Sequence, residues 1–104
     1  MEDKKTEFGL ATYLEDQGRI LITAPSFDFD SFPALGERLV SLLSASVLEK
    51  QRDADIHSWL VDFEDCHLFL KAEHYSESIW IEAFAPSEAK EELKYLSQLF
   101  RNGF

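Results

Sequence analysis

The sequence predicts an α+β fold: a two-layer sandwich with a mostly antiparallel sheet of five or six strands and two helices on one face. Short runs that alternate apolar and polar residues, typical of strands with one buried face, occupy residues 8–24 and 56–84. Two other runs repeat apolar residues at helical spacing, and each apolar stripe needs a sheet face to bury it. The elements follow the order ββα, three or four β, α. Residues 1–7 are predicted to be a flexible tail and residues 8–104 a single domain.

The first two strands are predicted to form a hairpin over residues 8–24. Gly18 supplies the positive φ that a tight turn requires. A turn at residues 16–18 assigns four apolar side chains to the core: Leu10, Leu14, Ile20 and Ile22.

The first helix is predicted to follow Pro25, which ends the preceding strand. Asp30 or Ser31 is placed to cap it, and Pro33 suits its first turn. Gly36 lacks a side chain and would let this helix approach the sheet closely. The apolar stripe consists of Phe32, Leu35, Leu39 and Leu43. Residues 46–55, which follow, are predicted to be either a short strand and a turn or the bulged start of the next strand.

Three consecutive strands are predicted between residues 56 and 84. A turn at residues 64–65 places Asp62 opposite His67 and Leu60 opposite Phe69. On this interpretation Cys66 lies on the core side, where we expect a buried, inert thiol.

The segment KAEHYSESIW, residues 71–80, is predicted to be the second hairpin of this group and not an active site. A turn at residues 76–77 places Lys71 opposite Glu82 and Phe69 opposite Phe84. Both turns assign the same residues to the apolar face. Consecutive strand residues point to opposite faces, so Glu73 and His74 cannot converge on one substrate atom.

The last element is predicted to be a helix after Pro86, capped by Ser87. Its apolar stripe consists of Ala89, Leu93, Leu96 and Phe100.

The charge of the chain disfavours several classes of partner. Twenty acidic residues against ten basic ones give a formal net charge of −10, and the basic residues are scattered. Nucleic acids and anionic membranes require a concentrated basic face, so we expect neither as a partner. No apolar stretch reaches the roughly 18 residues of a membrane span. A charged N-terminus without a following apolar run, and one cysteine, Cys66, predict a cytoplasmic location.

The histidines are the remaining candidates for chemistry. His57 and His74 are predicted to lie on the same face near one end of the sheet, where two imidazoles could bind a transition metal. Only Asp55 is near enough in sequence to add a ligand, and a zinc site needs three or four. We therefore expect no metal, no cofactor and no catalytic residues, and both histidines to be replaceable. The alternative is a small enzyme or ligand-binding protein with a pocket near His57 and His74.

The stretch from Asp55 to Phe84 resembles a small family of uncharacterised bacterial proteins, mainly gammaproteobacterial, known as a domain of unknown function. The resemblance rests on Asp55, His57, Trp59, Asp62, Phe63, Leu68, Leu70, Glu73 and Trp80. It covers about a third of the chain. It implies a stand-alone cytoplasmic protein and transfers no catalytic residue to this sequence.

The face of the sheet away from the helices is the predicted functional surface. Leu60, Phe69 and Phe84 form an apolar stripe there, with Ile56 and Trp80 nearby. Bare apolar patches of this kind mark contact sites. A second copy of the chain, another protein, or the first hairpin should cover it. We therefore expect a non-catalytic protein-interaction module.

Overall fold

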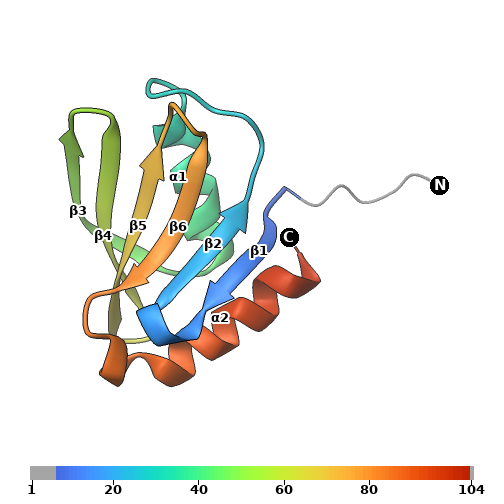
Figure 1. The fold of residues 1–104 in the computed structure, drawn as a ribbon. Coiled ribbons are helices and arrows are strands. Elements are labelled where there is room, and N and C mark those ends of the chain that lie inside the picture. Colours follow the sequence, from blue (N-terminus) through green and yellow to red (C-terminus); the bar gives the residue numbers. More distant parts are fainter. Residues whose placement is uncertain (1–6, 104) are drawn as a thin grey trace.

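A six-stranded antiparallel sheet with both helices on one face forms the fold (Figure 1). The computed structural model describes residues 7–103, so apart from Glu7 the predicted tail lies outside the described residues. The strands are β1 (Gly9–Leu14), β2 (Arg19–Thr23), β3 (Ser46–Asp53), β4 (Ile56–Phe63), β5 (Cys66–Glu73) and β6 (Ser78–Ala83). The helices are α1 (Phe32–Leu42) and α2 (Lys90–Asn102), with single 3₁₀ turns at Glu15–Gln17 and Pro86–Glu88. The strand order β1-β2-β6-β5-β4-β3 confirms the predicted fold class.

The β4–β5 hairpin has the predicted register. Phe63 lies opposite Cys66, and Leu60 lies opposite Phe69. Glu64 and Asp65 form the turn with φ of 51° and 67°. Two consecutive positive φ values define the tight turn whose twist matches that of the flanking strands, so a two-residue connection is possible here without glycine.

The β5–β6 hairpin has a wider turn than predicted. Glu73 lies opposite Ser78, so four residues form the connection and Lys71 faces Trp80 rather than Glu82. The Glu73 carboxylate accepts hydrogen bonds from the backbone N–H groups of Tyr75 and Ser76, at 2.9 and 3.1 Å, which stabilises the longer loop. The predicted pairing is therefore wrong by two residues. A shift of two leaves every side chain on its predicted face.

A bulge in β1 changes which residues of the first hairpin are buried. The register shifts between Leu10 and Thr12, so Tyr13 packs against the core and Leu14 lies opposite Arg19 on the other face. Ile20 and Ile22 are buried as predicted, but the assignment of Leu14 to the core is wrong. The hairpin extends the sheet beside β6 and does not fold over either face (Figure 1).

Residues 46–53 form β3, a full eight-residue edge strand, where the sequence left two alternatives open. A strand followed by a turn is the correct alternative, although the strand is longer than predicted, and its bulge between Val47 and Glu49 lies within β3 and not at the start of β4. The strand carries charges at Glu49, Lys50, Arg52 and Asp53. Charges and a bulge hinder the pairing of an edge with another sheet.

Asp28 and Ser31 close the turn that leads into helix α1, and Ser31 is the N-cap residue of the helix. The Ser31 N–H donates to Asp28 Oδ1 at 2.8 Å, and the Asp28 N–H donates to Ser31 Oγ at 2.9 Å. This reciprocal pair satisfies two backbone donors ahead of the helix, as a capping box does. Ser31 is therefore the N-cap residue, as one of the two predicted alternatives had it, and not Asp30; its side chain bonds to Asp28 and to no N–H group of the helix.

Gly36 of α1 lies directly against the ring of Trp59 in β4. A Cβ atom at Gly36 would lie 2.8 Å from Trp59 Cη2 and 3.0 Å from Phe32 Cζ. The Trp59 side chain is 1% exposed. The predicted close approach of this helix to the sheet is confirmed.

Helix α2 buries its predicted stripe, with Ala89, Leu93, Leu96 and Phe100 all at most 2% exposed. Ser87 lies within the preceding 3₁₀ turn, and α2 begins without a side-chain cap. The predicted Ser87 cap is therefore wrong.

We expect the substitution Gly36→Ala to destabilise the fold. Overpacking against Trp59 costs about 1–3 kcal/mol, which exceeds the roughly 1 kcal/mol that alanine contributes through helix propensity. Urea unfolding should show a lower free energy of unfolding, while Ser41→Ala on the exposed side of α1 changes little. An unchanged or higher stability of Gly36→Ala would contradict this packing.

Candidate functional site

The open face, defined here as the sheet face away from α1 and α2, carries two rows of cross-strand neighbours. One row runs Leu14, Arg19, Glu82, Phe69, Leu60 and Glu49. The next row runs Thr12, Leu21, Trp80, Lys71, Ser58 and Gln51. On β4 and β6 these side chains are partly exposed and alternate with buried ones, so the open face is sharply separated from the core.

The Phe69–Phe84 hollow, a depression of about 230 Å³, lies at one side of the open face. The Phe69 and Phe84 rings lie 5.7 Å apart between centroids, and Leu60 completes the apolar floor. Phe84 is 62% exposed. Its N–H donates to the His67 carbonyl at 3.3 Å, which holds the residue beside β5 just beyond the end of β6. The structure therefore brings together Leu60, Phe69 and Phe84, as predicted.

Trp80 belongs to a second hollow of about 390 Å³, formed with Leu14 and Leu21 from the first hairpin. In the rows above, Glu82 and Lys71 lie between the two hollows. Ile56 lies apart from both, between Asp53 and Glu73 on the neighbouring strands. The five predicted surface residues thus do not form one patch.

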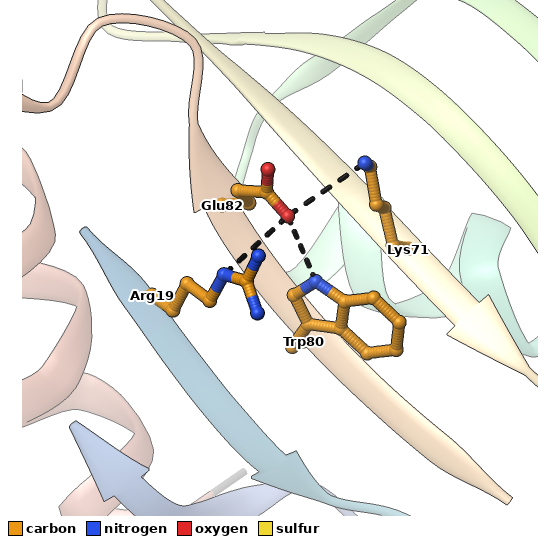
Figure 2. A network of polar contacts seen from close by, with 4 residues as sticks. All are labelled: Arg19, Lys71, Trp80 and Glu82. Atoms are coloured by element: carbon orange, nitrogen blue, oxygen red, sulfur yellow. Dashed lines mark hydrogen bonds and ion pairs between the residues drawn. The ribbon is translucent and has the colours of Figure 1, made fainter. Parts of the chain in front are cut away.

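Four side chains of the open face form a polar network (Figure 2). Glu82 Oε1 accepts a hydrogen bond from Trp80 Nε1 at 3.0 Å and lies 3.7 Å from both Arg19 Nε and Lys71 Nζ. The expected Lys71–Glu82 pair therefore exists as a diagonal contact. Asp62 lies opposite His67 as predicted, yet no ion pair joins them within residues 7–103.

The sequence reasoning missed Leu14, Leu21 and Arg19 as residues of the open face. Leu21 alternates with two buried isoleucines, and that pattern was sufficient to find it. The position of Leu14 on the open face could not be predicted, because the β1 bulge occurs in the sequence Leu-Ala-Thr, which contains no glycine to mark it.

An acidic hollow of about 320 Å³ lies on the other side of Phe84. Asp65, Glu88 and Glu92 line it, together with Cys66 and His67. Within residues 7–103, no lysine or arginine forms an ion pair with any of these three carboxylates.

Cys66 lies on the core side as predicted, but it is only partly buried. Burial raises the pKa of its thiol, and the negative charges of Glu92, Asp62 and Glu88 raise it further. A nucleophilic cysteine needs the opposite shift, because the thiolate is the reactive form.

His57 is a core residue that holds the loop before α1. Its side chain is 2% exposed and stacks on the Phe29 ring at 4.2 Å. His57 Nε2 lies 2.9 Å from the Phe29 carbonyl oxygen. A carbonyl oxygen only accepts, so Nε2 carries the proton. The burial of this ring argues against the expectation that His57 is replaceable.

His74 does not combine with His57 into a site. Its ring contacts the edge of Phe29 at 5.9 Å, so Phe29 lies against both imidazoles. A hollow of about 220 Å³ beside His57 is lined by Lys50, Arg52 and Trp59 among others, but not by His74. In the described part of the chain, no group of three or more His, Cys, Asp or Glu side chains is arranged to hold a metal ion.

Comparisons with known proteins give one match. A family model described as "Protein of unknown function (DUF3630)" matches residues 8–101, far more than the third of the chain that carried the predicted resemblance. A search of curated proteins and a search of solved structures each found no match. Over residues 7–103, no helix has the length and apolar character needed to cross a membrane. The gammaproteobacterial source and the cytoplasmic location stay predictions.

We expect the alkylation of Cys66 to report its raised pKa. The rate should reach half its maximum at a higher pH in the native protein than in the denatured protein, because the thiolate forms later. Glu92→Gln should move the native midpoint toward lower pH. A native midpoint at or below the denatured one would show that burial and carboxylates do not govern this thiol.

The substitution His57→Phe should test the buried hydrogen bond. The new ring still fills the space beside Phe29 but leaves the Phe29 carbonyl without its donor, which costs about 1–3 kcal/mol. Thermal unfolding should show a lower melting temperature than for wild type. His67→Phe, at an exposed position, is the control, and equal stability of both variants would refute the role assigned to His57.

Proposed function

Because the chain belongs to this family of unknown function, we propose its function from its own surface: it is a non-catalytic interaction module that binds another protein through the Phe69–Phe84 hollow. No activity is transferred to it from a relative.

The observation that carries the proposal is the exposure of Phe84 beside other apolar side chains. Single exposed apolar residues are common on protein surfaces and need no explanation. Phe84 differs because it forms one wall of a hollow whose floor is also apolar. Removing such a surface from water gains about 25 cal/mol per Å² of apolar area, and aromatic side chains in pockets dominate binding at interfaces.

The surroundings of the hollow have the character of an interface rim. Glu49, Gln51 and Ser58 line its polar side, and the Arg19–Glu82–Lys71 network borders it on the other. An apolar centre with a polar rim is the usual arrangement of protein–protein contacts. At about 230 Å³ the hollow is smaller than the roughly 300 Å³ of the smallest drug-sized pockets, which favours a side chain as its occupant.

The chemistry nearby supports binding over catalysis. The only thiol, Cys66, has a raised pKa, and His57 uses its protonated nitrogen to hold the Phe29 carbonyl. The raised pKa disfavours the reactive thiolate of Cys66, and burial keeps the His57 ring away from a substrate.

The proposal is tested by placing a photo-crosslinking amino acid at position 84 in cells that produce the protein. We expect a discrete crosslinked species larger than the chain. The control position is Leu42 on α1, which is 47% exposed on the far side of the sheet and should give no such species. No crosslink at position 84, or the same products at both positions, would contradict the proposal.

The substitution Phe69→Glu tests the same proposal by the expected loss of partner binding. A charge in the floor of the hollow should remove the crosslink at position 84, corresponding to a loss of affinity of about tenfold or more. The neighbouring core residues Leu68 and Leu70 are unchanged, so the circular dichroism spectrum should remain that of the wild type.

A further inference from the structure

We infer that the partner presents a bulky apolar side chain next to a lysine or arginine. The apolar side chain enters the Phe69–Phe84 hollow, and the basic side chain enters the acidic hollow on the other side of Phe84. This inference rests on the proposed function and adds the chemistry of the partner.

The two hollows are adjacent because they share a wall. Phe84 lines both of them, with Leu60 and Phe69 on one side and Glu88 and Glu92 on the other. Side chains two positions apart on one face of an extended segment are separated by about 6–7 Å. A single short segment that crosses Phe84 therefore reaches both hollows at once.

The negative charge of the acidic hollow favours a lysine or arginine as the partner side chain that enters it. Asp65, Glu88 and Glu92 face the acidic hollow without an ion pair inside residues 7–103. The negative charges of Glu92 and Glu88 also act on Cys66: the pKa of its thiol is raised by burial first and then by these carboxylates. The net charge of −10 adds a longer-range attraction for a basic partner.

A second copy of this chain fits these features poorly. Two chains of charge −10 repel each other. The cations in the two rows of the open face are Arg19 and Lys71, and both are paired with Glu82. A basic segment of a different protein satisfies the acidic hollow, and another copy of the open face does not.

The test selects randomised peptides displayed on phage against the wild-type protein and against Phe84→Ser. Wild type should enrich peptides in which an aromatic or large aliphatic residue lies within a few positions of lysine or arginine. Phe84→Ser should not enrich them. Enriched peptides without basic residues, the same enrichment on Phe84→Ser, or no enrichment would overturn the inference.

The matched charge reversals are Glu92→Lys and Glu91→Lys. Both change the same charge in the first turn of α2, but only Glu92 lines the acidic hollow. The enriched peptide should bind Glu92→Lys about tenfold more weakly than wild type, and Glu91→Lys almost as well as wild type. The difference should shrink at high salt. If both variants lose affinity for the peptide equally, the net charge of the protein alone explains the loss, and the inference is overturned.

The outcomes separate the two proposals. If position 84 crosslinks to a protein while selected peptides lack basic residues, the partner chemistry is wrong and the proposed function stands. If position 84 gives no crosslink, the proposed function fails and this inference falls with it. Sedimentation could also show a concentration-dependent dimer that Phe84→Ser abolishes. That result would identify a second copy of the chain as the occupant of the hollow and would overturn the inference of a basic partner.

Discussion

The contact between Trp59 and Gly36 fixes on which side of the sheet the protein is covered. The absence of a side chain at Gly36 lets α1 lie against the indole, and Phe32 packs on the same ring with centroids 5.2 Å apart. Helix α2 buries Leu96 and Phe100 in the same core. Because strand side chains alternate, covering the Trp59 side leaves Leu60 and Phe69 on the side that neither helix covers. The exposed apolar surface is thus a direct consequence of how the core is packed.

The structure explains which parts of the site were predictable from the sequence. The β4–β5 hairpin alternates strictly and closes with a two-residue turn, so the faces of Leu60 and Phe69 followed from simple register arithmetic. The β5–β6 pairing failed because Glu73 folds back onto the loop and widens it by two residues. An even shift preserves the faces, which is why Phe84 was still assigned to the correct surface.

The division of the open face into two hollows could not be predicted in the same way. It depends on β2 lying next to β6, a long-range pairing that brings Arg19 opposite Glu82. It also depends on a β1 bulge that turns Leu14 out of the core. Likewise, the acidic hollow joins the β4–β5 turn to the start of α2, two segments distant in sequence. Local patterns contain none of this information.

Hydroxyl-radical footprinting can show whether a partner covers the open face in the cell. Oxidation of Phe84 would be compared between the purified protein and the protein inside cells, with Leu42 and Tyr95, each about half exposed on other surfaces, as internal references. We predict that Phe84 is protected in cells while Leu42 and Tyr95 are oxidised as in the purified protein. Equal oxidation of all three residues in both settings would contradict it.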